Sequence, residues 1–136
     1  MRLQIEVPPG ELADRITILQ IKMEEIKDDE KLVHVNADLN QSLAVLDILR
    51  RSVGGLVWDQ LEPFMEELRE LNKRIWDIED NIRMLERVQD FGQEFVQTAR
   101  SVYFTNDKRA NVKRQINELF NSDIREEKSY TEYGHS

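Results

Sequence analysis

A hydrophobic repeat in the middle of the chain constrains the fold more than any other feature. Its apolar residues recur at alternating intervals of three and four: Leu61, Phe64, Leu68, Leu71, Ile75, Ile78, Ile82 and Leu85. This spacing places them on one stripe of an α-helix, as in a heptad seam. Pro63 fits only the first turn of a helix, so residues 56–62 could form a separate short turn. The stripe predicts a long helix packed in a hairpin, across a dimer, or both.

Three further segments carry helical periodicity and are bounded by residues that favour helix ends. Pro9 stands where a first turn tolerates proline, and the segment after it is apolar on two faces, as expected of a sandwiched helix. Asp28–Glu30 precede the next segment, and Gly54-Gly55 follow it. Asp90 and Gln93 resemble a capping box before the last segment. The predicted helices span about 10–27, 29–53, 57–89 and 91–120.

The two ends of the chain differ from its helical middle. Leu3, Ile5 and Val7 alternate with polar residues, which is typical of a β-strand. A lone strand is not stable, so it would lie extended on the helices or pair with another segment or copy. Residues 121–136 are polar, and we expect them to dock on other residues. We predict one all-α domain over residues 1–136, an antiparallel bundle of three to four long helices with a short extended N-terminal segment and a polar C-terminal tail.

Composition excludes several classes of protein. The chain has no cysteine, which removes disulfides, thiolate metal ligands and cysteine nucleophiles. No stretch reaches the roughly 20 apolar residues that span a bilayer, and the N-terminus has no signal-peptide core. A net charge of −8 and a pI near 4.8 oppose nucleic-acid binding. We expect a cytoplasmic protein with no nucleic-acid partner, no membrane insertion and no cofactor.

Residues 100–114 form a basic island in this acidic chain. Five cations against one acid give it a charge of +4, which leaves −12 for the rest. On a continuous helix, one face gathers Arg100, Tyr103, Phe104, Asp107, Asn111 and Arg114. Asn106, Arg109 and Lys113 fall on the other side, in line with apolar residues. Thr105-Asn106 would be the place for a break, since both residues favour caps.

The inward cations allow two interpretations, because a buried cation needs a carboxylate, a bound anion or water. One is a salt-bridge layer with acids of other helices, among them Glu11, Asp14, Asp77, Glu79 and Asp80. The other is a pocket for phosphate, sulfate or a sugar-phosphate with Arg109 and Lys113 as donors. The candidate ligand- or partner-binding surface is Arg100, Tyr103, Asn106, Arg109, Lys113 and Arg114, closed by Glu11, Asp14 and Arg15.

Other side chains indicate no reaction. Three carboxylate pairs at a spacing of three could hold Mg²⁺, as in the all-helical nucleotide pyrophosphatases, but a solvated acidic face explains them as well. These pairs are Glu11/Asp14, Glu67/Glu70 and Asp77/Asp80. His34 and His135 lie far apart, and Ser101 has no histidine within local reach. We therefore assign no metal site and no catalytic residue.

Four stretches resemble an uncharacterised all-helical domain family of bacteria and their phages. They are PGELADRITILQIK (9–22), LRELNKRIWDIEDNIR (68–83), FGQEFVQTARSVYFTNDKRANVKRQIN (91–117) and EEKSY (126–130). Members of that family stand alone, or beside or fused to glycosyltransferases of surface-polysaccharide assembly. The resemblance implies a helical fold and a saccharide-related setting, and it supplies no catalytic residues.

A second, weaker likeness is to the all-helical chorismate mutases. It rests on Leu68-Arg69, Arg74-Ile75, Asp77 and Asp80 along one helix. Those enzymes bind a dicarboxylate with Arg and Lys from a dimer, a part that the basic island and Arg15 or Lys22 would take here.

Taken together, the residues and the resemblance predict a non-enzymatic accessory or adaptor domain in cell-surface saccharide or glycosyltransferase pathways. We expect a homodimer with a basic surface for a protein partner or a small anionic ligand. The alternatives are a small enzyme, either Mg²⁺-dependent and pyrophosphatase-like or mutase-like, and a purely structural dimerisation module.

Overall fold

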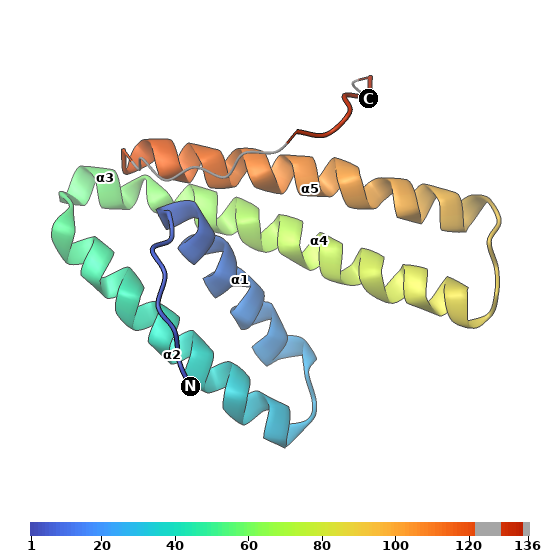
Figure 1. Cartoon of the computed structure of the whole chain (residues 1–136), viewed down its shortest axis with the longest axis horizontal. Helices are drawn as coiled ribbons and strands as arrows, with labels where there is room; N and C mark the ends of the chain where they lie inside the picture. The colour runs from blue at the N-terminus through green and yellow to red at the C-terminus, as the bar shows by residue number, and fades with distance from the viewer. Residues whose placement is uncertain (122–128, 135–136) are drawn as a thin grey trace.

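The computed structural model describes residues 1–121 and 129–134, and within these ranges the chain is all-helical with no strand. The helices are α1 (Pro9–Glu25), α2 (Asp29–Ser52), α3 (Gly55–Asp59), α4 (Leu61–Arg87) and α5 (Gln93–Leu119). The four long helices pack together and are antiparallel within the pairs α1–α2 and α4–α5 (Figure 1). The predicted all-α bundle is confirmed.

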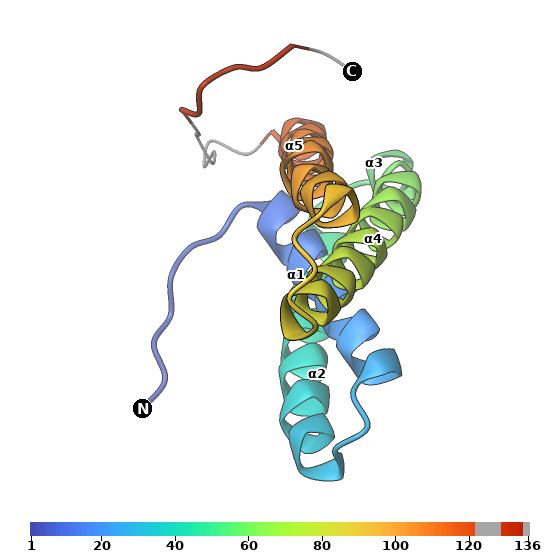
Figure 2. The same ribbon diagram turned by 90° about the vertical axis from the view of Figure 1, so that its right-hand side faces the viewer.

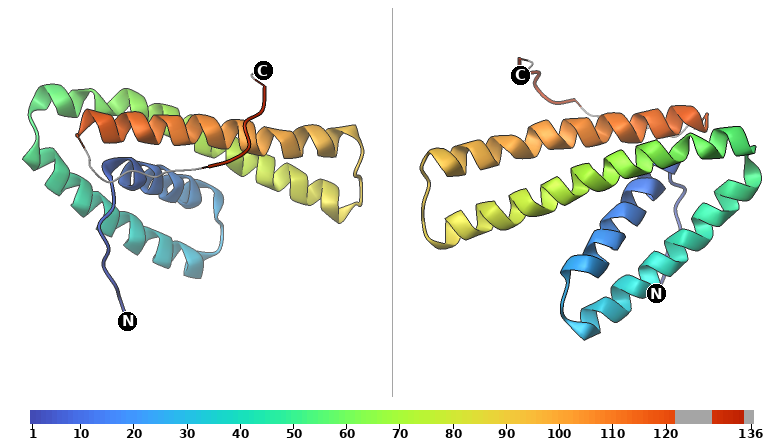
Figure 3. Two further views of the ribbon diagram at one scale, coloured as in Figure 1. Left: turned by 45° about the horizontal axis from the view of Figure 1, so that its top comes forward. Right: turned by 180° about the vertical axis from the view of Figure 1, so that it is seen from behind.

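The bundle consists of two helical hairpins, and α1 of the first packs against both helices of the second. The hairpins α1–α2 and α4–α5 meet near α3 and diverge away from it, which is seen most clearly from behind (Figure 3). α1 packs on α2 with one side and on α4 and α5 with the other. This position explains why α1 is apolar on two faces.

The core lies where α1 crosses the α4–α5 hairpin. Its buried residues come from these three helices: Leu12, Ala13, Ile16, Leu61, Met65, Leu68, Leu71, Val112 and Ile116. Ile16, Leu68 and Ile116 are completely buried, and each such side chain contributes about 1.5–3 kcal/mol through burial. α2 covers this core from outside, and its only buried residue is Ser42.

The heptad seam of α4 is buried less evenly in its second half than in its first. Leu61, Leu68 and Leu71 are buried, whereas Ile75, Ile78 and Ile82 are half-buried before Leu85 is buried again at 7%. Lys73 meets Glu25, the last residue of α1, through its ammonium group. Beyond this point α5 is the helix that packs along α4 (Figure 1). Where α5 alone packs on α4, the stripe is covered less completely than near the core, where α1 also packs on it.

The N-terminal segment is extended, as expected, but the prediction that it forms a strand lying on the helices or pairing with another described segment is wrong. Leu3 and Ile5 are 86% and 84% exposed, and the segment leads away from the helices (Figure 2). A strand needs an edge to pair with, and the described residues offer none. Pro8 and Pro9 also lack the amide hydrogens that such pairing uses.

The junctions at the two ends of α4 can be compared with their predicted form. The predicted capping box is wrong, because α5 begins after Gly92 without a side-chain cap. The Asp90 carboxylate instead accepts a hydrogen bond from the Gly92 amide at 3.1 Å, which closes a tight turn after α4. Residues 55–59 form the separate helix α3, and Pro63 lies in the first turn of α4.

Two other expectations about helix ends and continuity can be compared directly. Asp28 caps α2 by accepting hydrogen bonds from the amides of Glu30 and Lys31, at 2.9 and 3.2 Å. α5 runs without interruption through Thr105 and Asn106. The basic island therefore lies on one unbroken helix.

Candidate functional site

A layer of polar side chains crosses the core where α1, α4 and α5 meet. Its buried members are Asp14, Thr17, Asn72, Lys113 and Asn117, each at most 8% exposed. With Glu11 and Arg109 at its edge, we call this set the polar layer. Buried polar groups are tolerated only when they are hydrogen-bonded.

The Asp14 carboxylate stands at the centre of the polar layer. The Asn72 side-chain amide donates to Asp14 Oδ1 at 2.8 Å and to Thr17 Oγ1 at 2.9 Å. The Thr17 hydroxyl donates to the Asp14 carbonyl at 2.8 Å. Arg109 Nη1 donates to Asn72 Oδ1 at 3.3 Å, and its Nε lies 4.0 Å from Asp14 Oδ1. One carboxylate thus organises groups from all three helices.

Lys113 enters the polar layer from α5 and meets two acids of α1. Its Nζ lies 2.8 Å from Glu11 Oε2 and 3.8 Å from Asp14 Oδ2. The Lys113 side chain is 10% exposed, whereas that of Glu11 is 41% exposed. No buried side-chain nitrogen or oxygen among the described residues lacks a hydrogen-bond partner. The contacts of the inward cations are those of a salt-bridge layer.

The polar layer also fixes the start of α1 against α5. The Gly10 amide donates to Asn117 Oδ1 at 2.7 Å. A Cβ at Gly10 would stand 2.3 Å from the Lys113 carbonyl oxygen and 2.8 Å from Asn117 Oδ1. The two backbones therefore approach to a distance that only glycine permits.

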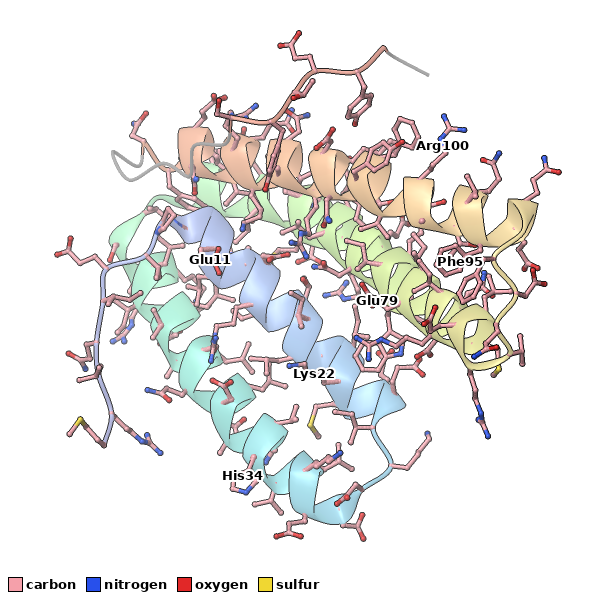
Figure 4. All side chains as sticks on the ribbon, turned by 45° about the vertical axis from the view of Figure 1, so that its right-hand side comes forward. Glu11, Lys22, His34, Glu79, Phe95 and Arg100 are labelled. Carbon is pink, nitrogen blue, oxygen red and sulfur yellow. The ribbon has the colours of Figure 1, made fainter. Side chains whose placement is uncertain are left out.

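The outward face of α5 is aromatic and charged. Tyr103 and Phe104 have ring centroids 4.8 Å apart, and the Arg100 guanidinium lies 5.7 Å from the Phe104 ring centroid. Asp107 follows one turn later. We call Arg100, Tyr103, Phe104 and Asp107 the aromatic ledge. Figure 4 shows Arg100 on the side of α5 away from α1, and Glu11 on α1.

The described part of the C-terminal tail docks on this aromatic ledge. The Tyr133 ring lies 5.2 Å from Tyr103 and 5.1 Å from Phe104, between centroids. Its hydroxyl donates a hydrogen bond to the Asp107 carboxylate. This bond is the main reason that the pKa of Tyr133 rises to about 12, with a smaller contribution from desolvation. The expectation that the tail docks is met at Tyr133. Residue 121 comes just after α5, and residues 122–128 and 135–136 fall outside the described residues.

An open groove of about 1140 Å³ lies between the tail and α5. Four residues of the tail, 130–133, form one wall. The helix supplies the other: Tyr103, Phe104, Asn106, Asp107, Lys108, Arg109 and Asn111. Aromatic, amide and charged groups thus converge on a surface open to solvent.

The structure divides the nine residues of the predicted surface among four places. Glu11, Asp14, Arg109 and Lys113 meet in the polar layer, and Asn106 lies half-buried beside Arg109 in the groove. Arg100, Tyr103 and Arg114 are on the outward face. Arg15 does not close this surface, because its guanidinium binds both carboxylate oxygens of Asp38 on α2 at 2.6 Å.

Sequence reasoning missed Gly10, Asn72 and Asn117, although each left a signal. Asn72 directly follows the seam residue Leu71, and Asn117 directly follows the stripe residue Ile116. An amide next to a buried apolar position on a long helix indicates a hydrogen bond within the core. Gly10 occupies a helical first turn, where glycine lowers helix stability unless close packing requires it.

The remaining polar constellations serve other contacts. Asp77 accepts from Lys73 at 3.0 Å, and Glu79 lies 3.4 Å from Arg83. The Ser101 hydroxyl donates to a backbone carbonyl of its own helix. His34 is exposed on the outer arm α2 (Figure 4). Across the described ranges, no three His, Asp or Glu side chains are arranged to hold a metal ion. His135 lies outside those ranges.

The fold and this site define a class of protein: a helical bundle held by a compensated polar layer, with an aromatic and basic surface on its last helix. The chain belongs to the family of unknown function DUF6165, whose profile matches residues 3–134. No curated protein and no solved structure shows significant similarity to it. Among the helices described, none is long and apolar enough to cross a membrane.

Proposed function

We propose that the chain is a non-enzymatic cytoplasmic adaptor that binds a partner protein through the outward face of α5, within a pathway of cell-surface saccharide assembly or glycosyltransfer. The observation that carries this proposal is the division of the basic island. Its inward cations meet carboxylates of α1, whereas Arg100, Lys108 and Arg114 are exposed. The saccharide setting rests on the resemblance of the motifs in 9–22 and 91–117.

The chemistry of the outward face favours a protein over a small anion. Arginine and tyrosine are enriched at protein interfaces because they combine a large contact area with hydrogen bonding. The aromatic ledge presents both types, together with one acid, Asp107. A pocket for phosphate or sulfate would instead need the cations that Glu11 and Asp14 already neutralise.

The proposal also includes a second copy of the chain, packed on the outer side of α2. This helix exposes Val33 by 68%, Val45 by 43% and Ile48 by 57%. Val45 and Ile48 are neighbours at a spacing of three, and apolar side chains exposed together favour association. The double variant Val33→Lys with Ile48→Lys should convert a dimer into a monomer in sedimentation analysis. A wild type that sediments as a monomer at ~100 µM, where ordinary homodimers persist, would remove the dimer from the proposal.

Charge reversal tests the partner surface. The wild type, the variant Arg100→Glu/Lys108→Glu/Arg114→Glu and the control Lys31→Glu/Arg51→Glu/Arg83→Glu serve as baits for crosslinking and quantitative mass spectrometry. The control reverses the same number of exposed cations on α2 and α4. We expect one partner to be lost from the α5 variant and retained by the control. Equal recovery by all three baits contradicts the proposal.

A thermal-shift experiment separates the protein partner from a small anion. Inorganic phosphate, sulfate and nucleotide sugars are added to the wild type and to Arg109→Ala. We expect the same small shift in both proteins, because the inward cations are engaged. A rise in melting temperature that Arg109→Ala abolishes would support the pocket instead and contradict the adaptor surface.

A further inference from the structure

The described tail, Ser129–Gly134, shows what kind of group the aromatic ledge holds. Tyr133 places its ring against both Tyr103 and Phe104, in edge-on arrangements of 62° and 87°. Edge-to-face contacts at these separations are favourable beyond the area they bury. The hydroxyl of the same residue donates to Asp107. One side chain therefore satisfies both the apolar and the polar part of the ledge.

We propose that the aromatic ledge is a recognition site for a tyrosine-bearing acidic peptide segment, and that the chain's own tail occupies it until a partner segment replaces it. This inference rests on the proposed function, since it states which part of the partner protein would bind to the outward face of α5. The tail would then act as an intramolecular competitor.

Three features of the ledge select such a segment. The rings of Tyr103 and Phe104 accept any aromatic side chain, but the Asp107 carboxylate requires a hydroxyl donor, which phenylalanine lacks. The exposed Lys108 lines the same groove as Glu132 of the tail. Opposite charges across a groove steer binding and fix its direction. The preferred ligand thus carries an acid next to its tyrosine, as Glu132 and Tyr133 do.

The degree of burial indicates that the tail can be exchanged. Tyr133 and Tyr103 each stay 42% exposed, and Tyr130 stays 75% exposed. A tethered segment competes at an effective concentration in the ~mM range. A partner segment with a dissociation constant in the ~µM range therefore displaces it at cellular concentrations. The groove beside the tail gives such a segment further surface to contact.

The test uses the full chain and a synthetic peptide. Acetyl-SYTEYG-amide, which repeats residues 129–134, is titrated by heteronuclear NMR into the wild type and into Tyr133→Ala. We expect shifts at the amides of Tyr103 and Asp107, and an apparent affinity at least ~5-fold higher for Tyr133→Ala, because the competitor is gone. Shifts of equal midpoint in both proteins, or no shifts at ~10 mM peptide, a concentration above the tether range, would overturn the inference.

A second peptide tests the role of the hydroxyl. SYTEFG keeps the ring and loses the donor to Asp107, so it should bind Tyr133→Ala ~5-fold more weakly, the equivalent of one hydrogen bond. The variant Asp107→Asn with Tyr133→Ala should reduce this discrimination. If SYTEYG and SYTEFG bind equally well, the aromatic ledge does not distinguish tyrosine from phenylalanine, and the inference fails.

The outcomes distinguish this inference from the adaptor proposal. The peptide titration can fail while charge reversal on α5 still removes the partner, in which case the adaptor stands and the tail is not a competitor. If both proposals hold, Tyr133→Ala should also increase recovery of that partner. A decrease in recovery would mean that the tail contributes to the partner surface, which contradicts competition.

Discussion

Both faces of α5 carry basic residues, but those on the inward face are paired with carboxylates and those on the outward face are exposed. Lys113 on the inward face is 8% exposed and lies between two carboxylates of α1. Lys108 on the outward face is exposed and lines an open groove. Lys113 joins α5 to α1, and Lys108 is available to another molecule. The charge of a segment therefore indicates a binding site only once its buried cations are told apart from its exposed ones.

The sharpest test of this contrast removes one lysine from each face. Lys113→Met should lower the free energy of unfolding by about 3 kcal/mol, because it removes the buried cation between Glu11 and Asp14 and leaves Asp14 with Arg109 alone. In melting temperature this is about 10 °C. Lys108→Met, five positions away on the same helix, should change stability by less than about 0.5 kcal/mol. Urea unfolding followed by circular dichroism measures both. Similar losses in the two variants would break the contrast.

Close packing on the inward face can be tested separately from charge. Gly10→Ala places a Cβ 2.3 Å from the Lys113 carbonyl oxygen, and this backbone atom cannot turn aside as a side chain could. We expect a loss of about 2 kcal/mol through overpacking and a weakened Gly10–Asn117 hydrogen bond. Gly55→Ala is the control, since an added Cβ there meets nothing within 4 Å. A Gly10→Ala variant as stable as this control would show that the helices can separate freely.

Lys73 shows how burial alone changes the contribution of an ion pair to stability, because its pair has the same length as that of Lys113. Its Nζ lies 2.8 Å from Glu25, the same length as the Lys113–Glu11 pair, but its side chain is 40% exposed. Lys73→Met should shift the melting temperature by no more than about 2 °C, because exposed pairs contribute little.

The pH dependence of Lys73 follows from the same contacts. Hydrogen bonds to Glu25 and then Asp77 raise its pKa above the ordinary 10.5. Its small contribution is thus complete below pH 10.5 and is lost as the pH rises through the raised value. Thermal melts of the wild type and Lys73→Met should therefore converge at high pH. A difference that grows with pH would contradict this assignment.

The smallest effect on stability is expected at the tail, where the readout is a titration. The pKa of Tyr133 is raised to about 12 from 10, so docking is fully favoured below pH 10 and is lost as the pH rises through 12. Phenolate absorbance of the wild type minus that of Tyr133→Phe should give a midpoint near 12. In Asp107→Asn the same difference should move back towards 10. A midpoint of 10 in the wild type would contradict the Tyr133–Asp107 contact.

Much of the fold followed from periodicity, because an apolar stripe needs only the local spacing of residues to be recognised. The helix-by-helix pattern and the inward and outward faces of α5 agree with the structure. The partners of the inward cations did not follow, since Glu11 and Asp14 are about 100 positions away and were two among five candidate acids. Gly10, Asn72 and Asn117 were missed because their role depends on how two helices cross.

The site could be predicted only as a set of residue types on one helix. Arg15 was placed with the basic surface, but the crossing of α1 turns it towards Asp38 on α2. The contact of Tyr133 with the aromatic ledge also joins segments without any shared local pattern. Such contacts are decided by tertiary packing, which a single sequence does not encode in its spacing.

The contact between Gly10 and Asn117 has a consequence for how the protein is made. The two residues are 107 positions apart, and a ribosome adds ~5–20 residues per second. α1 therefore emerges from the ribosome roughly 5–20 s before its partner helix is complete. During that interval the core around Asp14, Thr17 and Ile16 lacks the residues that α5 contributes. We expect the core to stay incomplete on the nascent chain, within reach of chaperones, until α5 is released.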